Sequence, residues 1–396
     1  MNIKIQKNIE DSLQAELVEY RRHIHSYPEL GFKEFETAKY IKSILNKYNI
    51  ETKDICETGF VADIGKGGHC IALRTELDGL PVEEKTNLEY SSKIPGRMHA
   101  CGHDLHIAVL LGVAKVLKQN EDKIEGRVRL IFQPGEEVLP GGASKMIAAN
   151  VLKDANVEYV FSQHIDPMLP AGTISIPQKE AMASTNELFW TIKGKASHAA
   201  QPHLGNDAIL ASVNIVNFIQ SIVTKFRNPI TPAVISVCSI NGGNTTNIFP
   251  SEVKMQGVMR TFDMKLRKEI EELLISKSSD IAALYNTSCE LYIDHGYPAL
   301  INNSNAVKIV TDAANNIFNK SDIEIAEPKL LAEDFAYFAQ ELPSCYWFMG
   351  TARENEEKYS LHSPFINPSE EVLIKGVKLF IEIVNTALNK LNTENN

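Results

Sequence analysis

The sequence predicts an α/β protein in which a smaller ferredoxin-like α+β domain is inserted into a mixed sheet covered by helices. Three observations predict it. In the first part of the chain, short apolar segments alternate with helices, the pattern of strands buried between helical layers. Near residue 185 the strands begin to alternate polar and apolar residues. After residue 296, long helices and apolar strands return, so we interpret the middle segment as an insertion.

The elements of the first part follow from apolar runs and helical periodicity. Two amphipathic helices come first, and a third, apolar on most faces, begins where Asp104 is placed to cap it. We expect helices at residues 8–27, 34–48 and 104–120, and strands at 70–77, 128–134 and 158–164.

The inserted domain, residues 185–296, has the order β-α-β-β-α-β, which is the ferredoxin-like split arrangement. Residues 1–184 and 297–396 then form one discontinuous domain, completed by a closing helix with Ser369 as its N-cap. The strands expected in the insertion are 187–194, 233–240, 252–262 and 289–296, and its helices are 206–226 and 263–285. After the insertion we expect a helix at 303–318, a strand at 344–350 and the closing helix at 369–391.

Composition narrows the class of protein. The chain is 44% hydrophobic and 23% charged, as in an ordinary globular protein, and its net charge of −10 argues against a nucleic-acid partner. We find neither a signal peptide nor an apolar stretch of about 20 residues, so we expect no membrane partner. Six scattered cysteines without a CxxC pair are expected to be reduced thiols in a cytoplasmic protein.

The stretch MHACGHDLH, residues 98–106, concentrates groups that can bind a metal. Cys101 and His103 are two residues apart, so in extended backbone they face the same way. Either residue alone is as well explained by an inert buried cysteine or a hydrogen-bonded histidine. The density of donors at one junction between a loop and a helix nevertheless favours a metal site. We expect Asp104 and His106 to cap and pack the helix that follows.

Three further segments place donors where strands end. QPGEE, residues 133–137, follows one predicted strand, His164 ends another, and His362 lies in the loop after a third. Because ligands of α/β sheets gather beyond the carboxyl ends of the strands, these donors are expected to meet Cys101 and His103. This number of donors fits two bound metal ions better than one.

The glutamate pair at 136 and 137 distinguishes a catalytic site from a structural one. Paired glutamates in a loop usually form a solvated turn, but this pair directly follows a buried strand. Adjacent residues in extended backbone point opposite ways, so one can bind metal while the other takes a proton from the reacting water. A structural site needs no such spare base. The pattern therefore favours metal-assisted hydrolysis.

The order of motifs resembles the M20 metallopeptidase family, specifically its amidohydrolase subfamily of N-acyl-amino-acid, hippurate and auxin-conjugate hydrolases. The resemblance covers roughly residues 12–390 and rests on ALRTELDGLP, MHACGHDLH, IFQPGEE, GGASKM, QHIDPMLPAG, GKASHAAQPH, NTTNIFP, GVMRTFD, AEDFAYF and LHSPF. It implies a catalytic domain of the zinc-peptidase type, with the insertion as a lid and dimerisation domain. In this sequence KASHAA replaces a glycine pair and RTELDG replaces RADMDA, which puts substrate preference in doubt.

The resemblance implies a role for each matching residue. Glu136 would be the general base. Two divalent metals, zinc or manganese with cobalt or nickel as alternatives, would be held by Cys101, His103, Glu137, His164 and His362.

Further roles concern the substrate. His198, by itself as well explained as a surface histidine, would stabilise the oxyanion across a homodimer. Asn247 and Arg260 would bind the free carboxylate of the substrate, although Arg260 can equally be a surface residue. Asp78 would orient a metal ligand or cap a helix, His203 would lie behind the site, and His23 and His25 in RRHIHSYPELGF are interpreted as structural.

The expected function is metal-dependent hydrolysis of the amide bond of small N-acyl-L-amino acids, with acetyl, benzoyl or aryl-acyl groups. Three alternatives stay open: an N-acetyl-diaminopimelate deacetylase, a carboxypeptidase or dipeptidase, and a metal-binding relative without activity. The intact Glu136 and the full ligand set argue against the last of these.

Overall fold

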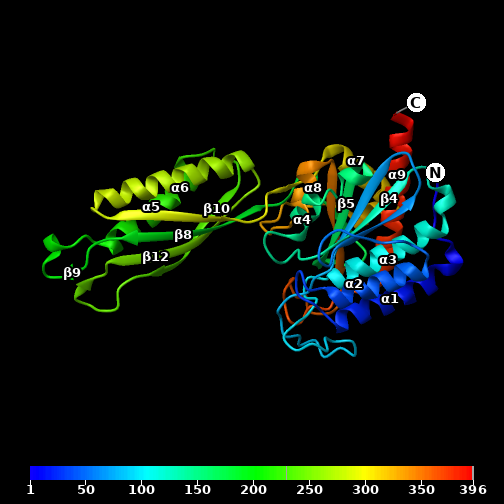
Figure 1. Cartoon of the computed structure of the whole chain (residues 1–396), viewed down its shortest axis with the longest axis horizontal. Helices are drawn as coiled ribbons and strands as arrows, with labels where there is room; N and C mark the ends of the chain where they lie inside the picture. The colour runs from blue at the N-terminus through cyan, green and yellow to red at the C-terminus, as the bar shows by residue number, and fades with distance from the viewer. Residues whose placement is uncertain (229, 395–396) are drawn as a thin grey trace. The chain divides into compact units, whose positions relative to one another are not determined.

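The structure is a computed structural model that describes residues 1–228 and 230–394. It divides into two compact units, which are described separately (Figure 1). The large unit contains Met1–Ala181, Ile301–Pro328 and Glu333–Asn396, and the inserted unit contains Met182–Leu300 and Lys329–Ala332. Residues 329–332, which the sequence predicts to belong to the first domain, lie with the inserted unit in the structure.

A sheet of eight strands forms the centre of the large unit, in the order β1-β2-β4-β3-β5-β16-β6-β15. The four strands β4, β3, β5 and β16 are parallel, and the neighbours β2 and β6 pair with them in antiparallel fashion. The mixed sheet predicted from the sequence is therefore confirmed. Its strands are β1 (Lys53–Asp54), β2 (Phe60–Gly65), β3 (Cys70–Glu76), β4 (Arg127–Gln133), β5 (Val157–Pro170), β6 (Ile174–Ile176), β15 (Ile323–Ile325) and β16 (Ser344–Ala352).

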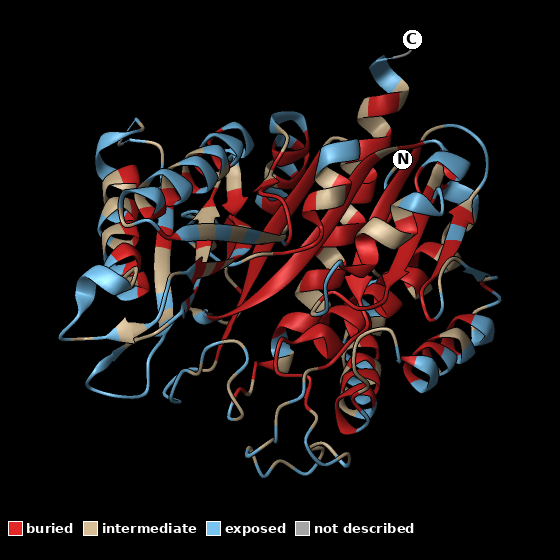
Figure 2. Cartoon of the chain, turned by 60° about the vertical axis from the view of Figure 1, so that its left-hand side comes forward, coloured by how far each residue is buried: buried red, intermediate tan, exposed pale blue. Residues whose placement is uncertain are grey.

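Helices bury the central strands, which Figure 2 shows as almost wholly buried. The apolar helix α3 packs between α1 and α9 and against β3. Leu73 of β3 faces this core, whereas its neighbour Arg74 points to the opposite side, toward the segment before α8. The helices are α1 (Glu10–Ser26), α2 (Phe35–Lys47), α3 (His103–Gln119), α4 (Gly142–Ala148), α7 (Ser304–Ile317), α8 (Ala336–Glu341) and α9 (Leu373–Glu394).

Two details of this unit differ from the sequence analysis. Asp104 does not cap α3: the N-cap position is Gly102, and the Asp104 carboxylate instead accepts hydrogen bonds from Arg21 and His25. His164 does not end its strand, because β5 continues to Pro170. Ser369 does act as a cap, accepting a hydrogen bond from the Glu371 backbone at the turn that leads into α9.

The inserted unit has an antiparallel sheet in the order β10-β12-β8-β13, with two helices on one face. Buried residues alternate along β8, where Leu188, Trp190 and Ile192 join the helices in the core. The predicted ferredoxin-like order is confirmed. The elements are β8 (Ser184–Lys193), α5 (Ala208–Lys225), β10 (Ala233–Asn241), β12 (Glu252–Thr261), α6 (Met264–Leu284) and β13 (Ser288–His295). This unit also contains the short pair of β9 (Ser197–His198) with β11 (Ile248–Phe249). A separate two-stranded sheet is formed by β7 (Glu180–Met182) and β14 (Leu300–Ile301).

Helix α5 is long and apolar enough, by length and composition, to cross a membrane, with a mean hydropathy of 1.3. The sequence analysis did not expect such a segment. A third of its length is buried in the inserted unit, where Ala211, Ile215 and Ile219 pack on the sheet. The core of this unit therefore accounts for much of the apolar character of α5.

Candidate metal centre

The donors predicted from four segments come together in the large unit. His164 of β5 pairs with Phe348 of β16 in the strand register, near the carboxyl ends of β3 and β4. Groups whose donor atoms lie within 4.8 Å of one another are Cys101–His103–His164, Cys101–Glu137–His362, His103–Glu136–Glu137, Glu76–His103–His106 and Glu136–Glu333–Asp334. The first three groups contain all five predicted ligands together with the predicted base.

Two of the histidines are oriented by hydrogen bonds through Nδ1. His103 Nδ1 lies 2.8 Å from the carbonyl oxygen of Asp78, and His164 Nδ1 lies 2.7 Å from the carbonyl oxygen of Ile165. Donation from Nδ1 leaves the lone pair of each Nε2 free, the arrangement found around metal-binding histidines. His164 Nε2 lies 3.4 Å from the Cys101 sulfur, and His103 Nε2 is buried without a hydrogen-bond partner.

Glu137 and His362 complete the donor set at its more exposed side. Their side chains approach to 3.1 Å, between His362 Nε2 and Glu137 Oε1. His362 has a left-handed backbone, with φ of 65°, and its N–H donates to the carbonyl oxygen of Ala100 at 2.8 Å. This bond ties the late loop to the segment that contains Cys101.

Asp78 contacts two of the ligand-bearing segments. Its carboxylate accepts a hydrogen bond from the Glu137 backbone at 2.9 Å and lies 3.3 Å from His103 Nδ1. No described helix has Asp78 as its N-cap, so the capping role considered for it is wrong. Its contacts are those of a residue that orients ligands.

Glu136 is buried in the loop that follows β4. Its carboxylate lies within 4.8 Å of Glu333 and Asp334. Burial, followed by the charges of Glu333 and Glu137, raises the pKa of Glu136 well above its usual range. A carboxyl group in such surroundings can hold a proton as well as accept one.

Arg74, Glu333 and Asp334 form an ionic cluster that the sequence analysis did not assign to the site. Arg74 Nη2 lies 2.9 Å from Glu333 and 2.7 Å from Asp334, and Arg74 also pairs with Glu76. All of these groups are buried. The sequence signal for this cluster is the arginine that directly follows the apolar run CIAL in a strand predicted to be buried, since a buried cation requires carboxylate partners.

His106 supports the centre without being free to bind metal. Its Nδ1 lies 3.0 Å from Glu76, and its Nε2 accepts a hydrogen bond from the backbone N–H of Ile165 at 2.9 Å. Both ring nitrogens are therefore engaged, although the side chain lies near His103. His106 packs the start of α3, as expected, and holds the residue next to His164.

The residues fit a divalent metal site. Thiol, imidazole and carboxylate donors suit zinc or a similar late divalent metal. Burial and the charge of Glu137 raise the pKa of the Cys101 thiol, so a nearby cation is needed for the thiolate to form. Burial lowers the pKa of His103, but the hydrogen bond with Asp78 and the charge of Glu76 outweigh it and raise that pKa to about 10. The surplus of negative charge favours cation binding.

The remaining predicted residues lie in the inserted unit. His198 pairs with Ile248, and the N–H of Ala199 donates to the carbonyl oxygen of Asn247 at 2.9 Å, so His198 and Asn247 are neighbours. His198 Nδ1 accepts a hydrogen bond from Ala200 at 3.1 Å, which leaves Nε2 outward. Arg260 lies half-buried in β12, and His203 is exposed in a short turn.

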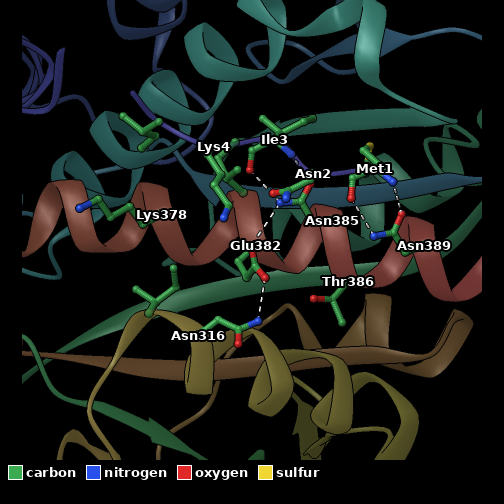
Figure 3. Close-up of a pocket in the computed structure, with 13 residues that line it drawn as sticks. Met1, Asn2, Ile3, Lys4, Asn316, Lys378, Glu382, Asn385, Thr386 and Asn389 are labelled. Atoms are coloured by element: carbon green, nitrogen blue, oxygen red, sulfur yellow. Dashed lines mark hydrogen bonds between the residues drawn. The ribbon is translucent and has the colours of Figure 1, made fainter. Parts of the chain in front are cut away.

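A separate pocket of the large unit, drawn in Figure 3, contains none of the predicted site residues. It lies between the N-terminal segment and α9. Two asparagines of α9 hold that segment: Asn385 exchanges hydrogen bonds with the backbone of Ile3, and Asn389 bonds with Met1. These contacts are structural links between chain segments.

A model of peptidase family M20/M25/M40 matches residues 72–386. N-acetyl-L-cysteine deacetylase of Bacillus subtilis is 36% identical over 92% of this chain and 86% of its own length. Thermostable carboxypeptidase 1 of Saccharolobus solfataricus is 38% identical over 93% of this chain and 95% of its own length. The chain belongs to peptidase family M20/M25/M40.

A solved structure supports the same M20 fold. The YXEP protein of Bacillus subtilis, described as a dinuclear metal binding peptidase from the M20 family, matches with a TM-score of 0.84 and 33% identity over 96% of this chain and 99% of that one. The M20 match contains every candidate site residue, from Asp78 to His362. The resemblance predicted from the motifs is confirmed, and this M20 chain is a hydrolase.

Proposed function

We propose that the chain is a metal-dependent amidohydrolase that cleaves N-acyl-L-amino acids into a carboxylate and a free amino acid. One observation supports this most directly. The large unit gathers five metal donors, and the carboxylate of a buried glutamate, Glu136, lies within 4.8 Å of the donor atoms of two of them, His103 and Glu137. A structural metal site needs no such spare carboxylate, whereas hydrolysis of an amide does.

The metals we propose are two divalent ions, zinc or manganese, held by Cys101, His103, Glu137, His164 and His362. At such a site divalent metals supply Lewis acidity, which lowers the pKa of a water and polarises a carbonyl. Glu136 takes the proton of the attacking water and passes it to the leaving amine. Its raised pKa suits this double role, because the group must release the proton it has accepted.

The inserted unit supplies recognition in this proposal. His198 presents its outward Nε2 to the carbonyl oxygen as negative charge develops on it, and Asn247 and Arg260 bind the carboxylate of the amino acid. His203 stays a candidate for a supporting role. We propose a cytoplasmic homodimer joined through the inserted unit, and the six free cysteines fit a reducing compartment.

The substrate class follows from the relatives. One relative named above is an N-acetyl-L-cysteine deacetylase, which supports an N-acyl amino acid as substrate. Another is a carboxypeptidase, which keeps peptide cleavage as the second candidate. Both reactions break an amide next to a free carboxylate, so the same centre serves either.

A substrate panel tests the proposal. The metal-depleted protein is supplied separately with Zn²⁺, Mn²⁺, Co²⁺ and Ni²⁺ and assayed on N-acetyl, N-benzoyl and indole-acyl amino acids, on N-acetyl-diaminopimelate and on dipeptides. We expect metal-dependent release of free amino acid, fastest with an N-acyl amino acid. Fastest cleavage of dipeptides would favour the second candidate. Metal binding with no hydrolysis of any substrate would refute both.

Mixed dimers test the role of His198. Glu136→Gln and His198→Ala are each expected to be nearly inactive. If His198 acts across the dimer, mixing the two variants creates one intact site per mixed dimer, so part of the activity returns. No recovery in mixtures that do exchange subunits contradicts the role across the dimer.

A further inference from the structure

The loop that contains Glu136 and Glu137 is held by a segment far away in the sequence. Glu34 Oε1 accepts a hydrogen bond from the N–H of Gly135 at 2.7 Å and another from the N–H of Phe32 at 2.9 Å. Its other oxygen accepts a hydrogen bond from the Thr58 hydroxyl at 2.6 Å. Glu34 is fully buried, so these bonds are shielded from water.

The ring of Phe32 lies directly against the same loop. A Cβ atom built on Gly135 would meet the ring at 2.7 to 2.8 Å, closer than packed atoms normally approach. Gly135 therefore has to be glycine both for this contact and for its φ of +54°. Lys145 Nζ lies 3.8 Å from the centre of the ring, which fixes the ring further.

The backbone of Phe32 is strained. Its φ is 62°, in the left-handed region that bulky side chains rarely occupy. Such conformations persist where the surrounding contacts hold them, and they cluster at functional sites. Here the contacts that hold Phe32 are the hydrogen bond to Glu34 and the packing on Gly135.

Two buried carboxylates thus hold alternate residues of one loop. Glu34 holds the N–H of Gly135, and Asp78 holds the N–H of Glu137 at 2.9 Å. Glu136 lies between the two anchored residues. A loop fixed at both of its flanking amides leaves little freedom for the side chains of Glu136 and Glu137.

We propose that Phe32 and Glu34 are positioning residues that hold the loop 134–137, so that Glu136 and Glu137 keep their separate directions. Only the expected effect on catalysis rests on the proposed function. The structural content of the inference, a loop anchored by Glu34 and Phe32, does not depend on which substrate is cleaved.

Hydrogen exchange of the metal-depleted protein tests the anchoring directly. We expect Glu34→Ala and Phe32→Ala to speed amide exchange in the peptide around residues 133–138 by about tenfold or more, with little change elsewhere. Glu34→Gln, which keeps the acceptor and the size, should restore most of the protection. The matched controls are the exposed neighbours Glu36→Gln and Phe35→Ala, which should match the wild type.

The metal and the reaction provide two further readouts. With Co²⁺ as the probe, Glu34→Ala should change the visible absorption of the bound cobalt, because Glu137 loses its fixed direction. In the assay, kcat should fall about 10- to 100-fold while KM changes less than about threefold, since the loop does not bind the substrate carboxylate in the proposed mechanism. Thr58→Val, which removes only the hydroxyl that donates to Glu34, should change the spectrum and kcat in the same direction but by less. It replaces Glu34→Ala in these measurements if that variant does not fold.

A double-mutant cycle isolates the contact of the ring with the loop. Gly135→Ala alone should impair the enzyme strongly. Combined with Phe32→Ala, which makes room for the new methyl group, it should cost less than the product of the two single effects.

Unchanged exchange around 133–138 in folded Glu34→Ala and Phe32→Ala would overturn the proposal. So would exchange that rises equally across the large unit, because that result means a general loss of stability. An inactive wild type would instead count against the proposed function, while the exchange and cobalt measurements would still decide the anchoring.

Discussion

At the scale of single residues, the site depends on carboxylates in different surroundings. Glu137 lies beside His362, whereas Glu136 is buried near Glu333 and Asp334. The two adjacent glutamates therefore have different surroundings, because an imidazole lies 3.1 Å from Glu137 whereas Glu136 has two further carboxylates within 4.8 Å. Asp78 contacts both His103 and the backbone of Glu137.

The role of Glu136 predicts the behaviour of Glu136→Gln. The variant should keep its metals, because none of the five proposed ligands is changed, but it can no longer accept a proton. We expect kcat to fall by about 10²- to 10⁴-fold, the usual contribution of a general base. Metal content by elemental analysis and kcat on the best substrate of the panel check this. Turnover close to that of the wild type would refute the role.

The raised pKa of Glu34 predicts that the free energy of unfolding depends on pH. Burial, with the charge of Asp78 adding to it, raises the pKa of Glu34 from 4.5 to about 7 in spite of its hydrogen bonds. Between these values the folded state binds more protons than the unfolded state, so the free energy of unfolding falls as the pH rises. The contribution is fully present below about pH 4.5 and is lost above about pH 7, in total about 3 kcal/mol at 1.36 kcal/mol per pKa unit.

Urea unfolding of the metal-depleted protein at a series of pH values measures this dependence. Glu34→Gln should flatten the change in stability relative to the wild type, since it carries no titratable group. The exposed Glu36→Gln serves as the control and should follow the wild type. Parallel curves for the wild type and Glu34→Gln would contradict the assigned shift.

At the scale of elements, α3 connects the core to the metal centre. The helix begins at His103 and is buried along nearly its whole length between α1 and α9. Its first turn supplies His103 and His106, so the packing of its apolar body fixes the position of both rings. Sequence periodicity predicts this helix well because burial on most faces leaves an uninterrupted apolar pattern.

The substitution Gly112→Ala tests how tightly α3 packs against its neighbouring helices. A Cβ at this position would lie 2.7 Å from Val377 of α9 and 2.8 Å from Leu17 of α1. Overpacking of this kind costs about 1 to 3 kcal/mol, more than the gain of about 1 kcal/mol in helix propensity. Gly112→Ala should therefore lower the free energy of unfolding. The control is Gly376→Ala in α9, where a Cβ would have its nearest contacts at 3.1 to 3.3 Å, so the loss of stability should be smaller. If Gly112→Ala is as stable as the wild type or more stable, the core around α3 is packed more loosely than the structure indicates.

At the scale of the whole molecule, each unit has its own hydrophobic core, and all five proposed ligands belong to the large unit. We therefore expect two unfolding transitions in calorimetry, of which only one depends on metal. At a free metal concentration of about 100 times the Kd, the large unit should gain about 2.7 kcal/mol, and chelation should remove that gain. If metal raises the midpoint temperatures of both transitions equally, the unfolding of the two units is coupled, which contradicts this prediction.

The fold class, the inserted ferredoxin-like unit and the donor types can be predicted from the sequence alone, because hydrophobic periodicity and local clusters such as MHACGHDLH are visible along the chain. The resemblance assigned Glu136 as the base and Glu137 as the metal ligand, and both roles stay predictions.

The groups that surround the candidate site are known from the three-dimensional structure and not from the sequence. Asp104 belongs to an ionic network with Arg21 and His25 and not to a helix cap, and Arg74 pairs with Glu333 and Asp334, some 260 residues away. Glu34 binds the N–H of Gly135, 101 residues later in the chain, and Phe32 packs on the same glycine. A buried charge takes its partner from whatever segment the sheet brings near it, and no local pattern records that choice.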